Sequence, residues 1–391
     1  MTPAPTRARA RAAGDACPGI IDLHPARDGQ VARIRVPGGY ASPARLRSLA
    51  AMSARFGDGH VDLTARGNVQ VRGIRSGEEG TLAQWAAAAG LLPSAAHDRA
   101  RNITASPLAG LAGHRSLRSL VLALDRAIVA DDCLAALPGR FLFCLDDGSA
   151  RAGLGGCDVG LRRGAGGAGL IVAGRETALC VPAARAIELM IAAARAFLAE
   201  RPDSSAVTRV AGLPDGGARV AAAAGGVLGD PVTDTAARLP LGLMPDAGPL
   251  AVVAAPLSRL TAEQLRLVAG MVRRGEVVRM ASAGRIVLPL ARPADQAIGV
   301  LAAAGLLVCD DHFLAAVTAC SGMSCARSLA DVRSAAGPVG GAGAVHWAGC
   351  GRRCGRPADA TAVVAMSATQ FTLEDGSGRV PVTWRGDDAR I

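Results

Sequence analysis

Four cysteines near the C-terminal end stand in two close pairs. Cys320 and Cys325 lie in the segment CSGMSC, and Cys350 and Cys354 lie in GCGRRC. Thiolates this close together can share one turn of the chain, so two such pairs can converge on one inorganic centre. Glycines flank both pairs and would let backbone N–H groups approach the sulfur atoms. The pattern favours an iron–sulfur cluster, which proteins hold with four thiolates.

Two other interpretations of these cysteines stay open at this point. A zinc site also uses four thiolates, although its pairs usually follow a tighter spacing than the one seen here. Ordinary buried thiols or a disulfide are the second alternative, because free cysteine is a common core residue. Six further cysteines are expected to be core thiols: Cys17, Cys133, Cys144, Cys157, Cys180 and Cys309.

A helix is predicted directly after the first pair. In ARSLADVRSAA (326–336), Leu329 and Val332 fall on one face of a helix, which would place Cys325 at its N-terminus. The helix dipole and the unpaired N–H groups at that end would favour a thiolate over a thiol.

A second segment with chemistry is VDLTARGNVQVRG (61–73). If it forms one strand, alternate residues build an apolar face and a polar face. The polar face would consist of Asp62, Thr64, Arg66, Asn68, Gln70 and Arg72. Arginine, asparagine and glutamine are fork-shaped hydrogen-bonding groups that suit carboxylates, although a polar face can equally be solvated.

The segment RNITASPLAG (101–110) is a second group of the same kind. Its Arg101 and Asn102 precede a turn, where they could bind a ligand or form a helix-capping loop.

Composition limits the choice of partners and location. The chain of 391 residues contains no lysine, so all 43 of its basic residues are arginine, and its net charge of +10 will attract polyanions. Basic tracts interleaved with aromatic residues, which nucleic-acid binding would favour, are missing, and a small polycarboxylate substrate fits the charge equally well, so we expect no nucleic-acid partner. We expect no membrane segment and no signal peptide, because no long apolar run exists. Ten cysteines without such a signal indicate a cytoplasmic protein.

The chain also contains an internal repeat. Strands are predicted at ARIRVP (32–37) and LAVVAAP (250–256), and each precedes a helix, one from Ser42 and one from Thr261. A second strand and a second helix follow in both copies, so each copy is a β-α-β-α half-unit that needs a partner to cover its sheet. Chance similarity between Ala/Leu-rich helices is the alternative explanation.

The correspondence extends beyond the half-units. ITAS (103–106) matches VTAC (317–320), which aligns Ser106 with Cys320. Between the copies, the strands RFLFCLDD (140–147) and GLIVAG (169–174) and a long helix over 183–199 predict a separate α/β unit. The tail FTLEDGSGRVPVTW predicts a hairpin with a turn at Asp375-Gly376.

Taken together, ACPG near the start, DLTARGNVQ, RNITASPLAG, the repeat and the cysteine pairs resemble the nitrite/sulfite reductase superfamily. Within it, the RGN sequence and the ACPG opening are most similar to the precorrin-3B synthase family. The resemblance implies an α+β fold in which duplicated ferredoxin-like half-repeats pair into one domain, flanked by two α/β units that bind a cluster and a tetrapyrrole. The expected units are a disordered lead-in with ACPG (1–30), the first half-repeat (31–92), the first α/β unit (101–243), the second half-repeat (244–310) and the cluster unit (311–391).

The resemblance also implies roles for individual residues. The ligands of a [4Fe-4S] cluster would be Cys320, Cys325, Cys350 and Cys354. The catalytic residues would be Arg66 and Asn68. The tetrapyrrole would be bound by Arg66, Asn68, Gln70, Arg72, Arg101 and Asn102. The first cysteine pair departs from the family pattern, because it encloses four residues where the family usually has five.

The implied activity is the oxygen-dependent hydroxylation and lactonisation of precorrin-3A in cobalamin biosynthesis. Dioxygen and NADH-derived electrons would be co-substrates, with NADH or a redox protein as electron donor. A sirohaem-dependent nitrite or sulfite reductase is the alternative enzyme, and a non-catalytic zinc or cluster module is a third possibility. Whether sirohaem or a separate mononuclear iron accompanies the cluster stays open.

Overall fold

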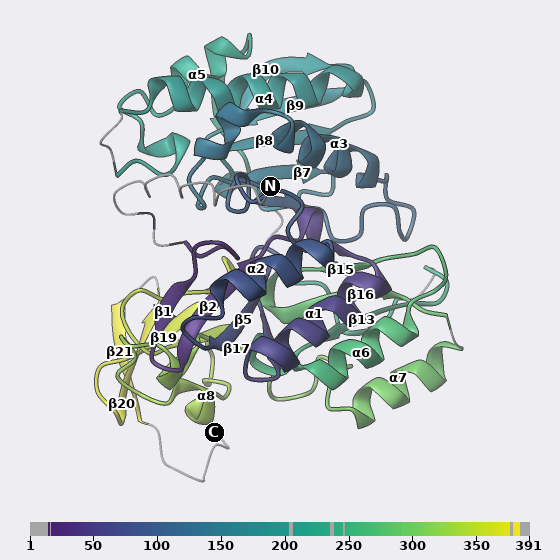
Figure 1. Ribbon diagram of the computed structural model, residues 1–391, viewed down its shortest axis with the longest axis vertical. Helices are drawn as coiled ribbons and strands as arrows, with labels where there is room; N and C mark the ends of the chain where they lie inside the picture. Colours follow the sequence, from purple (N-terminus) through teal and green to yellow (C-terminus); the bar gives the residue numbers. More distant parts are fainter. Residues whose placement is uncertain are drawn as a thin grey trace, which may run out of the picture.

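Four β-sheets organise the chain in the computed structural model (Figure 1). The structure describes residues 15, 17–202, 206–234, 238–244, 247–291, 293–375 and 378–383. Two of the sheets belong to the half-repeats, and the other two form α/β units beside them. Within the described residues, no helix has both the length and the apolar character needed to cross a membrane.

Each half-repeat contributes a five-stranded antiparallel sheet and two helices. The first sheet has the order β1 (His24–Ala26), β2 (Gly29–Ile34), β5 (Val69–Ile74), β4 (His60–Leu63) and β14 (Arg259–Thr261), with helices α1 (Pro43–Phe56) and α2 (Glu79–Ala88). The second has the order β12 (Gly242–Leu243), β13 (Leu250–Ala254), β16 (Arg285–Pro289), β15 (Val278–Met280) and β3 (Tyr40–Ala41), with helices α6 (Ala262–Met271) and α7 (Ala294–Ala303).

The two half-repeats exchange one short strand each. Strand β3 of the first copy pairs with β15 of the second, and β14 of the second copy pairs with β4 of the first. Each exchanged strand runs directly into a helix, and the first residues before these helices, Ser42 and Thr261, cap them with their hydroxyl oxygens. Helices α1 and α6 pack on each other, and one hydrophobic core spans both copies. The predicted duplication is therefore a single paired domain.

The polar segment 61–73 is not one strand, and this prediction is wrong. Strands β4 and β5 form a hairpin whose turn is closed by hydrogen bonds from the Thr64 N–H to the Asn68 carbonyl (2.9 Å) and from the Gly67 N–H to the Thr64 carbonyl (3.0 Å). Gly67 takes the positive φ that the turn needs. The second copy turns in the same way between β15 and β16, through the short helix η6 (Ser282–Gly284).

The first α/β unit lies at the top of Figure 1. Its sheet has the order β6 (Ile103–Ala105), β7 (Phe143–Asp146), β8 (Val159–Arg163), β9 (Ala168–Val172), β10 (Arg175–Val181) and β11 (Leu228–Pro231). Its helices are α3 (Arg118–Val129), α4 (Ala183–Glu200) and α5 (Ala218–Ala223). Strands β6, β7 and β8 run parallel, and the long helix expected over 183–199 is confirmed as α4.

The C-terminal unit repeats this strand order. Its sheet is β17 (Val317–Ala319), β18 (Val345–Ala348), β19 (Thr361–Ala365), β20 (Gln370–Asp375) and β21 (Gly378–Thr383), with three parallel strands followed by a hairpin. The alignment of Ser106 with Cys320 is confirmed, because each follows the edge strand of its sheet. The Ser106 N–H donates to the Leu145 carbonyl at 3.0 Å, and the Cys320 N–H donates to the Trp347 carbonyl at 2.9 Å. The predicted C-terminal hairpin is confirmed too, although Gly376 lies outside the described residues.

The helix predicted over 326–336 is wrong. Only α8 (Val332–Ala335) is helical, and Cys325 instead follows the short helix η7 (Gly322–Ser324). Asp331 lies in the middle of the segment and caps α8 with its carboxylate, which places the helix start at that residue. Cys325 therefore does not receive the stabilisation that a helix N-terminus gives to a thiolate.

The predicted α+β fold class is confirmed by these four sheets. The expectation that six cysteines are core thiols is only half right. Cys17, Cys144 and Cys157 are buried, whereas Cys133, Cys180 and Cys309 are exposed.

Gly39 tests the close approach of the two half-repeats. A Cβ on Gly39 would lie 2.2 Å from the Met280 carbonyl oxygen of the other copy. Gly39→Ala should therefore cost more free energy of unfolding than the about 1–2 kcal/mol expected for a left-handed alanine. The midpoint of thermal unfolding should fall accordingly. Gly90 has nearly the same φ (69° against 72°) but no described atom within 4 Å of its added Cβ, so Gly90→Ala is the matched control. Equal midpoints for the two variants would contradict the prediction.

Candidate functional site

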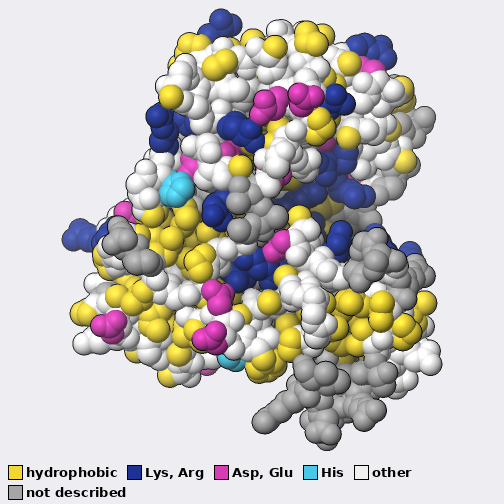
Figure 2. Space-filling model, turned by 180° about the vertical axis from the view of Figure 1, so that it is seen from behind, with side chains coloured by type: hydrophobic (Ala, Val, Ile, Leu, Met, Phe, Trp, Pro, Cys, Tyr) yellow, Lys and Arg dark blue, Asp and Glu magenta, His cyan; other side chains and the backbone are white. Residues whose placement is uncertain are grey.

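A cleft opens where the half-repeats meet both α/β units, and it encloses about 240 Å³. Two turns from the paired domain form part of its wall: the β4–β5 turn with Arg66 and Gly67, and the β15–β16 turn with Ser282. The first α/β unit adds Thr104, Ala105, Pro107 and 151–153, and the C-terminal unit adds 357–359. In Figure 2, arginine side chains gather in the hollow between the β7–β10 sheet and the rest of the molecule.

Arg238 lines the cleft, and two of its buried nitrogens lack a hydrogen-bond partner among the described residues. Its Nε donates to Asp359, but neither Nη1 nor Nη2 has a hydrogen-bond partner among the described residues, although both are buried. A buried guanidinium with unmet donors is costly unless a ligand accepts from it. A planar carboxylate fits this geometry.

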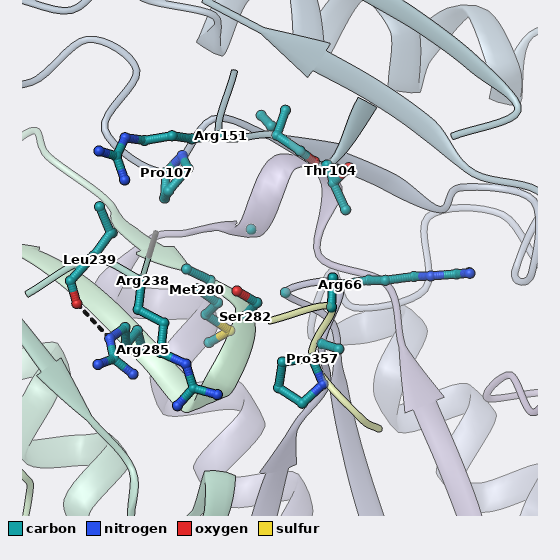
Figure 3. Close-up of a pocket in the computed structure, with 18 of the residues that line it drawn as sticks. Arg66, Thr104, Pro107, Arg151, Arg238, Leu239, Met280, Ser282, Arg285 and Pro357 are labelled. Atoms are coloured by element: carbon teal, nitrogen blue, oxygen red, sulfur yellow. Dashed lines mark hydrogen bonds between the residues drawn. The ribbon is translucent and has the colours of Figure 1, made fainter. Parts of the chain in front are cut away.

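Arg285 lies beside Arg238 and has a more structural setting. Its Nε donates to the Leu239 carbonyl at 2.6 Å (Figure 3), and its Nη2 is 3.4 Å from Asp310 Oδ1. Burial, together with the neighbouring Arg238 charge, lowers the pKa of Arg285. Arg285 therefore adds positive potential to the cleft while it holds the wall in place.

Arg66 lines the cleft, as the sequence analysis expected, but its side chain runs away from Arg238 and Arg285 (Figure 3). Its Nη1 donates to the Arg140 carbonyl at 3.3 Å. Burial, with the nearby charges of Arg209 and Arg35, lowers the pKa of Arg66 to about 10, so it stays a cation at neutral pH. Arg66 can therefore contact only one side of a bound molecule.

Arg151 reaches the cleft from a loop that one carboxylate organises. Asp146, which is fully buried, accepts hydrogen bonds from the Ser106 hydroxyl (2.9 Å) and from four backbone N–H groups, those of Gly148, Ala150, Arg151 and Ala152. Loops held this firmly present their side chains in a fixed place. Sequence analysis missed Arg151, Arg238 and Arg285. The repeat offered a signal for Arg285, which occupies the position that Asn68 has in the first copy.

Several expected site residues lie outside the cleft lining. Asn68 and Asn102 are buried and bonded to each other (Nδ2 to Oδ1, 2.9 Å), and Asn68 also accepts from the Val36 N–H. Arg101 forms a two-fold ion pair with Asp125. The Asn68–Asn102 bond joins the first half-repeat to the first α/β unit, whereas the Arg101–Asp125 pair lies within that unit.

Gln70 and Arg72 also point elsewhere. Gln70 accepts from Arg33 Nε at 3.2 Å when its amide oxygen faces that side chain. Arg72 reaches the C-terminal unit, where it donates to Ser321 and Ser324. The structure therefore brings only Arg66, of the six expected tetrapyrrole-binding residues, to the cleft.

The ACPG segment places Cys17 between two guanidinium groups. Its Sγ accepts from Arg33 Nη1 (2.9 Å) and Arg35 Nη2 (3.4 Å). Arg35 is fully buried, and its other partners are the Asn102 amide oxygen and the Gly139 carbonyl. Burial alone would raise the pKa of the Cys17 thiol, but the charges of Arg35 and Arg33 outweigh it and hold that pKa below its ordinary value. A Cys17 thiolate can thus balance a buried cation.

The four cysteines of the two pairs come together at the ends of β17 and β18. None of the ten cysteines forms a disulfide. The Cys320 sulfur accepts from the Gly349 N–H (3.2 Å) and the Gly322 N–H (3.4 Å), as a metal-bound thiolate would. Burial raises the pKa of the Cys354 thiol, and the three other thiols lie near enough to raise it further.

This donor set suits an iron–sulfur cluster. Among the described residues, no three His, Cys, Asp or Glu side chains converge closely enough to hold a single metal ion. Each thiolate of a cluster binds a different iron, so its ligands lie further apart than the ligands of one zinc ion. The chain then runs from Cys354 into Pro357–Asp359, which line the cleft. A cluster held here would therefore lie beside whatever the cleft binds.

Comparisons with known proteins agree with this arrangement. Residues 24–84 match the family model described as nitrite/sulfite reductase ferredoxin-like half domain. The solved structure of the NirA protein of Mycobacterium tuberculosis superposes with a TM-score of 0.71 at 19% identity, over 91% of this chain and 77% of that one. Residues 24–84 are thus a half domain of this family, within an α+β fold that resembles NirA.

Curated relatives match shorter segments. A ferredoxin–nitrite reductase of Leptolyngbya laminosa is 40% identical over 81 residues, and one of Synechococcus elongatus is 36% identical over 117 residues. A precorrin-3B synthase of a Sinorhizobium species is 35% identical over 69 residues. These matches cover 20%, 29% and 18% of this chain and only 16%, 22% and 15% of the relatives. They connect the chain to both activities and do not choose between them.

The Cys17 pair predicts a pH-dependent contribution to stability. A thiol whose pKa is lowered on folding stabilises the protein fully above its ordinary pKa of 9.0, and this stabilisation is lost as the pH falls through the folded-state pKa. The difference in unfolding midpoint between the wild type and Cys17→Ala should therefore widen as the pH rises toward 9.0. The exposed Cys133→Ala variant should show a flat difference. A flat profile for Cys17→Ala as well would show that the thiol does not ionise in this pair.

Proposed function

We propose that this protein is an oxidoreductase that holds a [4Fe-4S] cluster on Cys320, Cys325, Cys350 and Cys354 and acts on a tetrapyrrole polycarboxylate in the cleft. The specific activity proposed is that of a precorrin-3B synthase: hydroxylation and lactonisation of precorrin-3A with dioxygen. Electrons would come from NADH directly or through a redox protein.

The observation that carries the proposal is the position of Arg238. Arg238 lines the cleft, two of its nitrogens have no partner in the part of the chain that the structure describes, and its Nε is fixed by Asp359 on the loop that follows the second cysteine pair. A carboxylate bound by Arg238 would thus be held against the unit that carries the thiols. Arg151 and Arg66 reach the same cleft from other elements, so separate carboxylates of one large ligand could each meet a cation.

The chain's own residues would bind and orient the substrate. Guanidinium groups fix the carboxylates, and this positioning is the proximity term of catalysis. Leu239, Met280 and Pro357 supply apolar walls that exclude water from the reacting carbon. The cluster supplies electrons one at a time when it is bound. Asn68 and Asn102 would act indirectly, since they fix the β4–β5 turn that carries Arg66.

A nitrite or sulfite reductase that uses sirohaem is the second candidate. It is favoured by the two nitrite reductase matches, the longer of which extends over 117 residues. Sirohaem is itself a polycarboxylate tetrapyrrole, so the cleft chemistry suits it as a cofactor. The absorption spectrum of the purified protein distinguishes the two, because sirohaem adds Soret and red bands that a cluster alone does not have.

The cysteine assignment is tested with Cys350→Ser in protein purified without oxygen. Loss of one thiolate ligand should remove most of the iron and acid-labile sulfide and bleach the visible absorption, because a serine oxygen is a poor ligand for the cluster. Cys309→Ser alters an exposed cysteine outside the pairs and is the control. Full iron, sulfide and activity in the Cys350→Ser protein would contradict the assignment.

The reaction is tested by incubation of the protein with reductant, precorrin-3A and isotopically labelled dioxygen, followed by mass measurement of the pigment. We expect one labelled oxygen atom in the product. Unlabelled pigment together with brisk reduction of nitrite or sulfite would assign the chain to the reductases instead.

Arg238→Gln should weaken pigment binding by about tenfold or more, because one charge-assisted pair contributes about 1.5–3 kcal/mol.

A further inference from the structure

Arg72 lies outside the cleft lining and reaches from the first half-repeat to the C-terminal unit. It stands on β5 of the first half-repeat, and its side chain is 6% exposed. Its Nη1 donates to the Ser321 hydroxyl at 3.1 Å, and its Nη2 donates to the Ser324 carbonyl at 2.9 Å. Both acceptors belong to the short loop between Cys320 and Cys325. One buried arginine thus holds the loop that carries the first cysteine pair.

The arginine is itself held in one orientation. Asp28 accepts from Arg72 Nε and Nη2, both at 3.0 Å, which fixes the plane of the guanidinium. A lysine could place a charge in the same region, but a single ammonium on a flexible stem cannot reproduce this planar set of contacts. The loop is therefore held by the planar set of guanidinium hydrogen bonds and not by positive charge alone.

Further contacts from the first half-repeat converge on the same loop. The Arg27 N–H donates to the Ser324 carbonyl at 3.1 Å, so this oxygen has two donors from outside its own unit. On the other side of Cys320, Arg333 pairs with Asp62 of β4 at 3.1 Å, and its charge acts on the Cys320 thiol. The first cysteine pair therefore depends on residues about 250 positions earlier in the chain.

The loop itself offers few restraints of its own. It contains the three-residue helix η7, and Cys325 is not capped by a longer helix. Gly322 takes a positive φ of 58° within it. A short loop of this kind is mobile unless outside partners hold it. Arg72 alone makes two hydrogen bonds to this loop.

We propose that Arg72 is a positioning residue that fixes the Cys320–Cys325 loop from the neighbouring half-repeat and thereby sets how firmly a cluster is retained. This inference rests on the proposed cluster. It assigns to Arg72 a role different from contact with the tetrapyrrole, which was its expected role from the sequence.

The experiment compares Arg72→Gln and Arg72→Lys with the wild type after anaerobic reconstitution with iron and sulfide. Loss of iron to a chelator is timed, and the electron paramagnetic resonance spectrum of the reduced protein is recorded. We expect iron loss to be about tenfold to a hundredfold faster in both variants, the range typical for groups that orient metal ligands. The spectrum should broaden as the loop takes several positions.

Two further variants make the result specific. Arg75→Gln removes an exposed arginine three residues along the chain and should match the wild type. Ser321→Ala removes one acceptor without altering Arg72 and should give an intermediate rate, which keeps the test valid if an Arg72 variant folds poorly.

Each outcome is decisive. Wild-type rates and spectra in Arg72→Gln and Ser321→Ala would overturn the proposal, and so would a fully normal Arg72→Lys, because the fork geometry would then be unnecessary. A wild-type protein that takes up no iron and sulfide would instead overturn the proposed cluster. The two failures are therefore distinguishable.

Discussion

The exchange of β3 and β14 between the half-repeats is the constraint on which the rest of the structure depends. Each half-repeat sheet is completed by a strand from the other copy, so neither copy can bury its core alone. The exchange also brings the β4–β5 and β15–β16 turns to one place, where they form part of the cleft wall. Gly39 and Gly67 both approach the Met280 carbonyl oxygen so closely that a side chain at either position would collide with it. The shape of the cleft therefore depends on the pairing of the two half-repeats.

The two α/β units show how one architecture can carry different chemistry. After its edge strand, the first unit has Ser106, whose hydroxyl donates to Asp146, and the carboxylate satisfies the neighbouring backbone N–H groups from within the protein. At the equivalent place the C-terminal unit has Cys320, whose sulfur accepts from the Gly349 N–H. A carboxylate closes the first position, whereas the thiols leave the second able to bind a metal centre. In the first α/β unit this position is therefore filled by a carboxylate that orders the loop of Arg151. In the C-terminal unit the equivalent position is suited to a cluster.

Much of the fold could be predicted from the sequence, because strand and helix periodicity and the duplication are local or repeated signals. The alignment of Ser106 with Cys320 came from four residues and survives in three dimensions. The site could be predicted less well. Alternation of polar residues continues through 61–73 although the chain reverses at Gly67, so a period-two pattern could not reveal the turn. Arg238 carries no motif at all. Its importance follows from nitrogens that no described residue satisfies, which is a property of packing rather than of sequence.

The cleft could bind a small anion or a tetrapyrrole, and the arginine side chains around it help to decide between these two ligands. A guanidinium presents a rigid fork, and the side chains of Arg66 and Arg238 run in different directions (Figure 3). A small anion such as nitrite could contact only one of these two guanidinium groups at a time. A tetrapyrrole with carboxylates around its rim can satisfy several at once, and its planar ring suits the apolar walls. This argument applies to a bound tetrapyrrole whether it is substrate or cofactor. Cation spacing therefore supports the ligand class more firmly than it supports the reaction, and the source of the product's oxygen is what separates the two enzymes.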